Sequence, residues 1–395
     1  MRISSMTLFP RGTAMAITAA ALLGLASANP AVARGSPKTD PPAAGPELVW
    51  PLQPELPRVR YLQAYHGSRD FRKKPSRWRR FLLGHEEEAS ISLRKPYGVT
   101  TGSDGTVYVT DTGFGAVVVF DPEARQVRLL GGGGRAALHT PIGIAIDAQE
   151  RIWVSDADLD HVFCFSPEGE VILAVGQGEG LTNPTGIAID RERQRLYVAD
   201  SHLHQIVLYS TADGAHIATL GSRGPGEGQF NFPTNVALDP EGNLYVVDTG
   251  NFRVQVFSPD GEFVSTFGEA GDGFGDFHRP KGIALDSEGH IYVADAAFNN
   301  VQIFDRQGQL LLFVGALGQK PGAFWLPAGV HIDEQDRIFV VDQVNARVQV
   351  FQYLTEAAAR ARSKINRKEN RRAPSSGRTV SPDEKGGESN HDTQS

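Results

Sequence analysis

Six histidine and aspartate side chains between residues 139 and 204 are of the types that bind metal ions. They are His139, Asp158, Asp160, His161, His202 and His204. Imidazole nitrogens and carboxylate oxygens together form sites for zinc and related divalent cations. Where a fold brings such side chains together, a divalent metal site is expected. The alternative is a polar loop surface covered by water.

An internal repeat sets the elements that must position these side chains. Six segments share the pattern Pro-x-Gly-Ile-Ala-x-Asp, then Ile-Tyr-Val-x-Asp, then Val-x-Val-Phe. The repeated prolines are Pro96, Pro141, Pro184, Pro233, Pro280 and Pro327. The aspartates that end the second strand are Asp111, Asp156, Asp200, Asp248, Asp295 and Asp342. These aspartates recur every 44–48 residues, a period typical of propeller blades.

Each repeat predicts four short strands. In the fourth repeat they are residues 235–238, 244–247, 254–257 and 263–267. The second strand is apolar throughout, as expected for a strand covered on both faces, whereas Arg253 and Gln255 alternate with valines in the third, as expected nearer the rim. The sequence therefore predicts an all-β, six-bladed β-propeller of four-stranded antiparallel blades.

The sixth repeat lacks a fourth strand after Phe351. A segment with the fourth-strand pattern lies at the other end of the chain, at residues 58–67, and ends on Gly67. We expect this N-terminal strand to pair with the third strand of the last blade and close the ring. Closure leaves only short, protected strand edges, and the propeller then spans residues 58–354.

The repeat resembles the NHL-repeat family. The resemblance rests on Pro-Thr-Asn-Val-Ala-Leu-Asp (233–239), Leu-Tyr-Val-Val-Asp (244–248), Asn-Phe-Arg-Val-Gln-Val-Phe (251–257) and the glycine-rich segment 224–230. It extends over all six blades. It implies the six-bladed propeller and says little about function, because such propellers serve as binding platforms, as sensors and occasionally as enzymes.

Residues that recur in every blade are expected to be structural. We expect the six aspartates to accept backbone N–H groups of the adjacent turn rather than to form a ring of carboxylates. Five first strands carry a glycine where the innermost strands of a propeller crowd together. These glycines are Gly98, Gly143, Gly186, Gly282 and Gly329.

Function is expected where one blade departs from the others. In an antiparallel four-stranded blade, the connection from the second to the third strand shares one face with the connection to the next blade. We call this the loop face. The predicted ligand-binding set on this face is His139, His161, His204, Arg253, His278 and Arg347. The six metal candidates also fall on this face, in blades two and three.

Two further residues have unusual positions. His331 occupies a first-strand position that holds threonine or alanine in the other blades, and the sequence favours a packed histidine over one that projects into the axial channel. Cys164, the single cysteine, lies between two phenylalanines in a third strand, where a thiol is an inert apolar group. A single cysteine also excludes a disulfide within the chain and a cysteine-based metal cluster.

The sequence predicts no catalytic set. Peptide-amidating lyases have a similar six-bladed propeller, in which zinc histidines directly follow the first-strand proline of three blades. The matching residues here are Tyr97, Ile142, Thr185, Thr234, Lys281 and Ala328, with no histidine among them. The resemblance therefore gives no support to zinc-lyase chemistry of that arrangement.

The ends of the chain lie outside the repeats. Residues 1–33 have the basic start, the apolar run and the Ala-x-Ala sites of a secretory signal peptide. Residues 34–57 form a Pro-rich strap or linker, and residues 355–395 a charged, largely disordered tail. No lipidation cysteine and no further apolar run of membrane-spanning length is present. The sequence therefore predicts a periplasmic or secreted protein.

Charge is unevenly distributed along the chain. Residues 91–354 hold 17 basic and 33 acidic side chains, a balance that disfavours nucleic acid as a partner. The long insertion 68–95 instead contains a basic segment at 69–80. We expect this segment either to dock on an anionic membrane or acidic partner, or to fold against the acidic propeller. Its docking residues are Arg69, Arg72, Lys73, Lys74, Arg77, Trp78, Arg79 and Arg80.

Together these observations favour an exported, non-catalytic binding or scaffold propeller of a bacterial-type cell envelope. We expect it to be a monomer without a cofactor that presents its loop face to a protein, peptide or glycan. The alternative is a metal-assisted lyase or hydrolase that holds a divalent metal on the same face.

Overall fold

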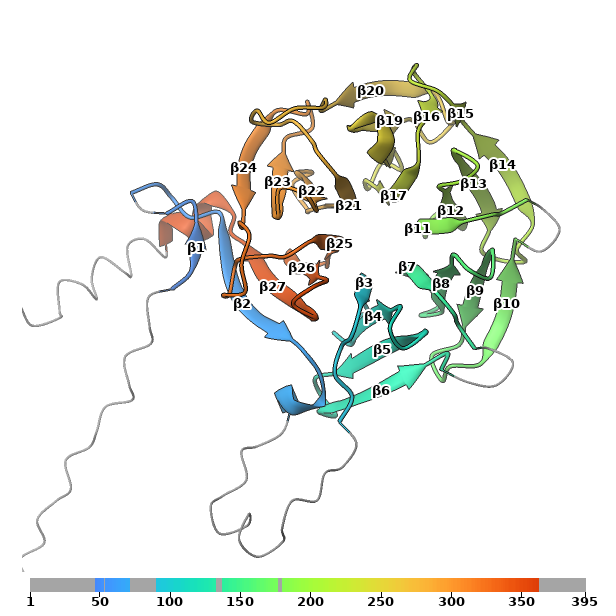
Figure 1. Cartoon of the computed structure of the whole chain (residues 1–395), viewed down its shortest axis with the longest axis horizontal. Coiled ribbons are helices and arrows are strands. Elements are labelled where there is room, and N and C mark those ends of the chain that lie inside the picture. The colour runs from blue at the N-terminus through green and yellow to red at the C-terminus, as the bar shows by residue number, and fades with distance from the viewer. Residues whose placement is uncertain (1–46, 53, 72–89, 133–136, 177–179, 362–395) are drawn as a thin grey trace, which may run out of the picture. The chain divides into compact units, whose positions relative to one another are not determined.

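The computed structural model describes residues 47–52, 54–71, 90–132, 137–176 and 180–361. Residues 46–395 form one compact unit, and the other unit, residues 1–45, lies outside the described residues. The described part is a ring of six antiparallel sheets around an axis (Figure 1). This is the all-β, six-bladed propeller that the repeat predicts.

The four strands of each blade, named a to d, run from the axis to the rim. Blade one contains β3 (Pro96–Thr101), β4 (Val107–Asp111), β5 (Ala116–Asp121) and β6 (Gln126–Leu130). Blade two contains β7 (Pro141–Ile146), β8 (Ile152–Asp156), β9 (His161–Phe165) and β10 (Val171–Val175). Blade three contains β11 (Pro184–Asp190), β12 (Arg195–Asp200), β13 (Gln205–Ser210) and β14 (His216–Leu220).

Blades four and five follow the same order. Blade four contains β17 (Pro233–Leu238), β18 (Leu244–Asp248), β19 (Arg253–Phe257) and β20 (Phe263–Phe267). The short strands β15 (Ser222–Arg223) and β16 (Gln229–Phe230) precede it in a glycine-rich connection. Blade five contains β21 (Pro280–Leu285), β22 (Ile291–Asp295), β23 (Asn300–Phe304) and β24 (Leu310–Val314).

Blade six is closed by the N-terminal strand, as predicted. It contains β25 (Pro327–Ile332), β26 (Arg337–Asp342), β27 (Arg347–Tyr353) and, as strand d, β2 (Val59–Tyr65). The pairing of β2 with β27 is antiparallel, from Val59 opposite Tyr353 to Tyr65 opposite Val348. The end of the predicted strap adds a short fifth strand, β1 (Val49–Trp50), on which Trp50 packs edge-on against Phe351.

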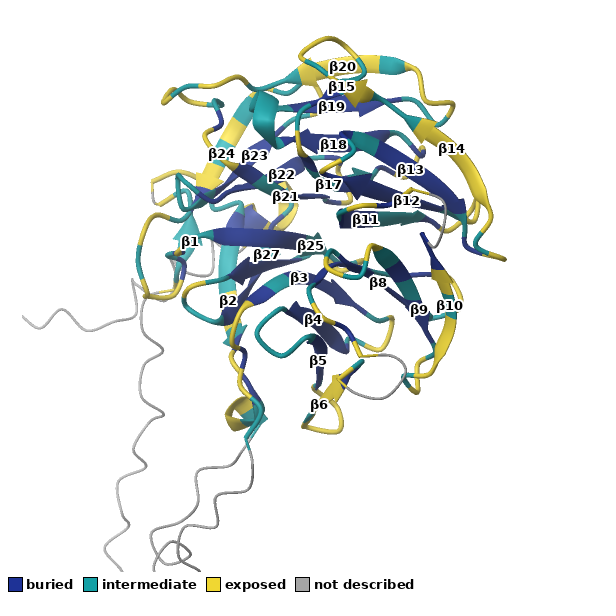
Figure 2. Cartoon of the chain, turned by 45° about the vertical axis from the view of Figure 1, so that its right-hand side comes forward, coloured by how far each residue is buried: buried dark blue, intermediate teal, exposed yellow. Residues whose placement is uncertain are grey.

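Burial separates the outermost strand from the other three. The d strands carry most of the exposed strand residues, whereas strands a to c are largely buried (Figure 2). In β19 the residues from Val254 to Phe257 are buried, and Gln255 is fully so. Strand c lies nearer the rim than strand b, as expected, but its polar residues do not mark an exposed face. Neighbouring blades pack face to face and cover strand c on both sides, so its polar side chains need partners inside the protein.

The repeated aspartate of each blade is fully buried at the end of strand b. In blade one, Asp111 accepts the N–H groups of Arg94 (2.7 Å) and Lys95 (3.0 Å), which lead into strand a. It also accepts the N–H groups of Gly113 (2.9 Å) and Phe114 (3.2 Å), which lead into strand c. Equivalent bonds form at Asp156, Asp200 and Asp295. The structural role predicted for the aspartates is therefore confirmed.

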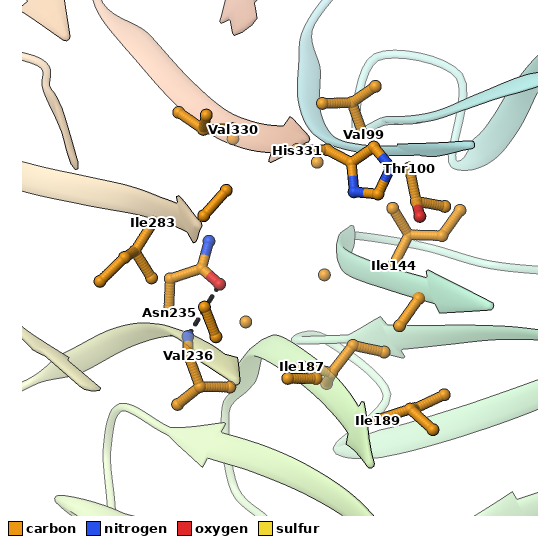
Figure 3. A pocket seen from close by; sticks show the side chains of 18 of the residues that line it. Val99, Thr100, Ile144, Ile187, Ile189, Asn235, Val236, Ile283, Val330 and His331 are labelled. Atoms are coloured by element: carbon orange, nitrogen blue, oxygen red, sulfur yellow. Dashed lines mark hydrogen bonds between the residues drawn. The ribbon is translucent and has the colours of Figure 1, made fainter. Parts of the chain in front are cut away.

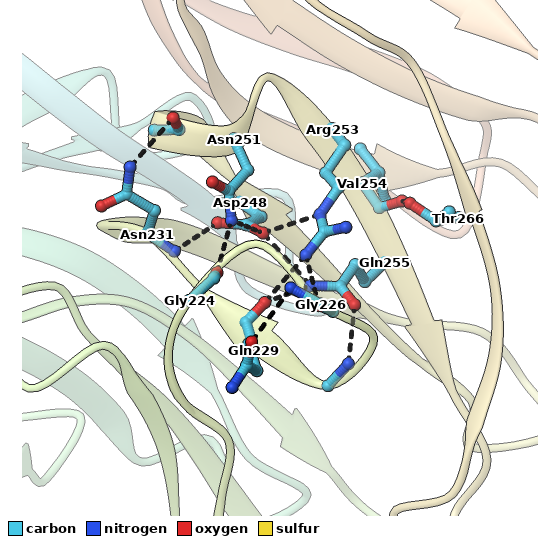
Figure 4. A network of polar contacts seen from close by, with 12 residues as sticks. Gly224, Gly226, Gln229, Asn231, Asp248, Asn251, Arg253, Val254, Gln255 and Thr266 are labelled. Atoms are coloured by element: carbon cyan, nitrogen blue, oxygen red, sulfur yellow. Dashed lines mark hydrogen bonds and ion pairs between the residues drawn. The ribbon is translucent and has the colours of Figure 1, made fainter.

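Blades four and six satisfy the same carboxylate in a different way. Asp248 accepts the N–H of Asn231 (2.6 Å) and the side-chain amide of Asn251 (2.8 Å). It also accepts the guanidinium of Arg253 (2.9 Å) and the buried amide of Gln255 (3.1 Å) (Figure 4). The matching partners of Asp342 are Trp325, Asn345, Arg347 and Gln349.

The arginines of these two networks also hold the glycine-rich connections. Arg253 donates from Nη2 to the carbonyl oxygens of Gly226 (2.7 Å) and Gln229 (2.9 Å). Arg347 makes the equivalent pair of bonds in blade six. Each guanidinium therefore links a buried carboxylate to the connection that leads into strand a.

Close packing of the a strands defines the axis. A Cβ atom on Gly98 would lie 2.4 Å from the carbonyl oxygen of Ile142 in the next blade, so this position admits only glycine. The hydroxyl of Thr110 donates to the same carbonyl at 2.8 Å. At the ring closure, the amide of Gln343 in blade six donates to the carbonyl oxygen of Pro96 in blade one at 3.3 Å. The crowding predicted for the first-strand glycines is confirmed.

Other sequence expectations concern Cys164 and the ends of the chain. Cys164 is buried in β9, and burial raises the pKa of its thiol to about 12, so the thiol is inert as predicted. Of the predicted tail, residues 356–361 are helical. No helix among the described residues is long and apolar enough to cross a membrane. The predicted signal peptide lies outside the described residues.

The hydrogen-bond network around Asp342 in blade six predicts that removing the Arg347 guanidinium strongly lowers the stability of the fold. Arg347 is 6% exposed and donates to Asp342 at 2.8 Å. The Arg347→Ala substitution leaves a buried carboxylate without its charged partner and should lower the free energy of unfolding by about 3–5 kcal/mol. Urea unfolding measures this loss. As a control, the exposed His139→Ala should change stability by less than about 0.5 kcal/mol, and equal effects of the two substitutions would contradict the buried role of Arg347.

A second prediction concerns His290, at the start of strand b in blade five. Its Nδ1 lies 2.9 Å from the buried carboxylate of Asp286. This hydrogen bond raises the pKa of His290 above its ordinary value of 6.5, against the opposing effect of burial. Protonated His290 therefore stabilises the fold below pH 6.5, and this stabilisation is lost as the pH rises through the raised pKa.

Arginine is the natural control because Arg151 and Arg337 make this contact in blades two and six. His290→Arg keeps the charged pair at every pH. The difference in unfolding free energy between wild type and His290→Arg should therefore shift in favour of the variant between about pH 5 and pH 8. Urea unfolding across this range tests it, and a constant difference would show that His290 does not titrate with folding.

Candidate functional site

The loop face contains the ends of strands b and d and the starts of strands a and c. In blade five, Pro280 lies opposite Asp295, which in turn lies opposite Asn300, and Val301 lies opposite Val314. The predicted site residues therefore share one face, but they differ in exposure. His139, His202 and His278 are exposed, His161 and Arg253 are half-buried, and His204 and Arg347 are buried.

Two arginines of the predicted ligand-binding set have structural roles. The guanidinium groups of Arg253 and Arg347 are directed at buried carboxylates and backbone carbonyls within their own blades. Arg347 is 6% exposed. Ligand binding by these two residues stays a prediction, and the structure shows that their hydrogen-bonding groups are directed into the protein.

His204 also has a structural role. Its Nδ1 accepts the N–H of Phe232 in the next blade at 3.0 Å, and burial lowers the pKa of its ring. Asn299 makes the same contact in blade five, where its side-chain oxygen accepts the N–H of Leu326 at 2.9 Å. Both residues link one blade to the next, and a ligand role of His204 stays a prediction.

The six metal candidates do not converge in the structure. His139 and Asp158 form an exposed pair, with Nδ1 and Oδ2 3.0 Å apart. The Nδ1 atom of His161 bonds to the carbonyl oxygen of Leu159, and its ring stacks on Phe163. Within the described ranges, no three His, Cys, Asp or Glu side chains form a group that could hold a metal ion. A metal at this set thus stays a prediction, supported by one contact pair.

The structure adds three exposed apolar side chains to the loop face. Phe232, Trp325 and Val344 are 45%, 41% and 46% exposed. The N–H of Val344 donates to the carbonyl oxygen of Trp325 at 3.2 Å, so these two residues are neighbours. Trp325 stands two residues before the repeated Pro327, where the other blades carry other residue types, whereas Phe232 and Val344 belong to connections whose exposure only the structure shows.

One position per blade combines a fixed backbone with a side chain that is exposed in five of the six blades. It lies two residues before the repeated proline, and its N–H donates to the buried aspartate in all six blades at 2.6–2.8 Å. We call these six residues the platform positions. They are Arg94, His139, Thr182, Asn231, His278 and Trp325, and all except the half-buried Asn231 are exposed. Their side chains differ although their backbones are held alike.

His331 lies on the wall of a cavity along the propeller axis. Its Nε2 is 2.9 Å from the hydroxyl oxygen of Thr101, and burial lowers the pKa of the ring to about 4. The sequence favoured a packed histidine without access to the channel. Burial and the contact with Thr101 bear out the packed histidine, and the cavity wall adds access to the axis.

The basic insertion is described only at its two ends. Arg69 is exposed in the short helix η1 (Ser68–Phe71). Hydrogen bonds from the N–H of Ser68 to Ile91 and from the N–H of Leu93 to His66, both 2.8 Å, hold the two ends together. The other predicted docking residues, Arg72, Lys73, Lys74, Arg77, Trp78, Arg79 and Arg80, lie outside the described residues.

Comparisons with known proteins agree with this fold. The NHL repeat model matches residues 230–257 and 277–304, in blades four and five. An auxiliary nutrient binding protein from Bacteroides thetaiotaomicron has a TM-score of 0.54 at 14% identity, covering 66% of this chain and 70% of that chain. A gluconolactonase from Xanthomonas campestris has a TM-score of 0.52 at 18% identity, covering 74% and 98%.

Virginiamycin B lyase from Staphylococcus aureus is also similar, with a TM-score of 0.50 at 13% identity, covering 66% of this chain and 95% of that chain. At such low identities the likeness concerns the fold alone. The family match in two blades and the ring of six four-stranded sheets lead to the same assignment. The chain is a six-bladed β-propeller that carries NHL repeats.

Proposed function

We propose that this propeller is a non-catalytic binding or scaffold module, exported to the cell envelope, that binds a protein, peptide or glycan on its loop face. The observation that carries the proposal is the geometry of the platform positions. Their backbone N–H groups are tied to buried carboxylates, while side chains as different as Arg94, His139 and Trp325 face solvent. The fold itself does not explain this variation of exposed side chains.

A rigid backbone beneath exposed side chains favours binding. Immobilising a loop opposes association, and a loop that is already fixed avoids most of this entropic cost. Trp325 and Val344 form an exposed apolar pair on such a fixed connection. Tryptophan and arginine are enriched among the residues that dominate binding energies, and an indole ring also stacks on sugar rings.

Basic groups accompany these apolar side chains. The guanidinium of Arg94 lies 4.0 Å above the ring of Phe114, and Lys95 is exposed beside it. His278 and Arg279 are exposed in blade five. Arg94, Lys95 and Arg279 therefore offer exposed cations to a partner with some negative charge, on a face that also carries the exposed Asp158 and Asp160.

The cellular location and the basic insertion are proposed from the sequence. Residues 1–33 have the pattern of a signal peptide, which supports export and a periplasmic or secreted protein. Residues 69–80 are proposed to attach the protein to an anionic membrane or an acidic partner, for which the clamped ends at residues 66–68 and 91–93 supply a fixed base.

We do not propose metal-assisted lyase or hydrolase activity as a second function. The similar solved structures include enzymes as well as a binding protein, so their fold does not decide between the two. In the described part of the chain, His139 and Asp158 form a contact pair without a third His, Cys, Asp or Glu positioned to share a metal ion with them.

The proposal predicts that Trp325 is required for binding. Trp325→Ala keeps the backbone N–H that bonds to Asp342 and removes only the exposed indole ring. Material retained from a cell-envelope extract by the immobilised propeller should fall about tenfold or more. Mass spectrometry identifies retained protein or peptide, and carbohydrate analysis identifies retained glycan.

Val264→Ala is the matched control, because Val264 is 57% exposed on the rim strand β20, away from the loop face. This variant should retain the same partners as wild type. Equal retention by Trp325→Ala and wild type would overturn the proposed binding face. A loss with both variants would instead show that retention depends on general surface hydrophobicity.

A further inference from the structure

A cavity of about 260 Å³ runs along the axis of the propeller. The a strands of all six blades form its wall, and most lining side chains are isoleucine, valine, leucine and alanine (Figure 3). Ligand sites in proteins are commonly such apolar cavities with a few fixed polar groups.

Two polar side chains of the wall depart from the repeat. Asn235 stands where the other five a strands have glycine, and His331 stands where the others have threonine or alanine. The repeat shows that the ring can be built with glycine and alanine at these positions. Neither an amide nor an imidazole is therefore needed to form the wall.

Both side chains have hydrogen-bonding groups left for a ligand. The Oδ1 of Asn235 accepts the N–H of Val236 at 2.8 Å, while its Nδ2 makes no hydrogen bond to the described residues. The Nε2 of His331 faces Thr101, and its Nδ1 has no described partner. Figure 3 shows the amide and the imidazole reaching into the opening from different blades. At neutral pH the imidazole is uncharged, because burial lowers its pKa to about 4.

A cationic side chain stands at each end of the channel. On the loop face, Lys281 of blade five reaches across blade six to the hydroxyl of Tyr97 at 3.3 Å and lies 4.8 Å from the centre of that ring. Ala328 is the matching residue of blade six, and its small side chain leaves room for this contact. At the opposite end, Arg191 lines the cavity and donates to the carbonyl oxygen of Ile146 at 3.1 Å.

Acidic side chains also surround Arg191 at this end of the channel. Glu334 is 3.9 Å from the guanidinium and 81% exposed, so the pair is weak and screened by water. The five aspartates at this rim already have polar partners within the protein. The pairs are Asp190 with Arg193, Asp333 with Arg337, Asp286 with His290, Asp239 with Asn243 and Asp336 with Ser287. Among the described lining residues, Arg191 carries the one side chain that is charged at neutral pH.

We infer that the axial channel binds a small aliphatic carboxylate. The carboxylate group accepts the Nδ2–H of Asn235 and lies in the field of Lys281 and Arg191, and the hydrocarbon part contacts the isoleucine and valine wall. His331 supplies a second polar contact deeper in the channel. The cavity lies near the lower end of the usual range of about 300–1,000 Å³ for ligand pockets, which favours a small organic acid over a peptide or an oligosaccharide. This site is independent of the loop-face partner.

Butyrate and butyramide are matched probes, because they have nearly the same shape and differ in charge. Ligand-observed NMR titration of the full chain at constant ionic strength should show saturable binding of butyrate and at least about tenfold weaker binding of butyramide. The absence of saturable butyrate binding, or equal affinity for the two probes, would overturn the inference.

The repeat supplies variants that preserve the fold. Asn235→Gly and His331→Ala introduce residue types that other blades have at the same positions. Arg191→Ser introduces serine, the residue type at the matching position of blade five, Ser287. Asn235→Gly and Arg191→Ser should each weaken butyrate binding about tenfold with an unchanged thermal midpoint, and His331→Ala should weaken it less. Glu123→Gln, in an exposed turn of blade one, should bind butyrate like wild type. Unchanged binding by a folded Asn235→Gly variant would place the probe elsewhere and refute the assigned site.

Discussion

The hydrogen bonds to the buried aspartate at the end of strand b are the constraint on which the loop face depends. A buried carboxylate is stable only when charge-assisted hydrogen bonds replace its hydration. In this propeller those bonds come from the connection into strand a and from the connection into strand c. Each aspartate therefore joins two connections that are distant in the sequence and fixes their geometry.

Two versions of this set of hydrogen bonds to the buried aspartate occur in the same chain. Asp111, Asp156, Asp200 and Asp295 rely on backbone N–H groups, whereas Asp248 and Asp342 add an asparagine, an arginine and a glutamine. In the second version, the arginine also donates hydrogen bonds to carbonyl oxygens of the glycine-rich connections that lead into blades four and six. The same loop face is therefore held by different side chains in different blades. Residues such as Arg253 that look available for ligands in the sequence hydrogen-bond to the buried aspartate.

Periodic features were predictable because they recur six times. The structural role of the aspartates, the crowded glycines and the closing strand at residues 59–65 followed from comparison between repeats. Individual roles were harder to predict. His204 and Arg347 are polar residues in connections, and only the packing of one blade on the next shows that their hydrogen bonds are directed inward. The burial of strand c was also hard to predict, because it too results from the packing of one blade on the next.

The candidate sites were partly visible in the sequence. Trp325 and His139 share a platform position, and that position could be identified from its distance to the repeated proline. The missing glycine at Asn235 is a sequence signal too, but its meaning depends on the axial cavity. Exposure of Phe232 and Val344, and the access of His331 to the channel, depend on how the blades meet. Six repeats therefore define the scaffold, and the departures from them define where binding is proposed.

Residue-resolved hydrogen exchange tests whether the buried carboxylates hold the exposed loop face rigid. The relevant amides are the N–H groups of Arg94, His139, Thr182, Asn231, His278 and Trp325. Although most of these residues are exposed, their amides should exchange as slowly as those of the buried b strands. Exchange as fast as that of an exposed turn, such as the one at Glu123, would show that the loop face is not held by the aspartates.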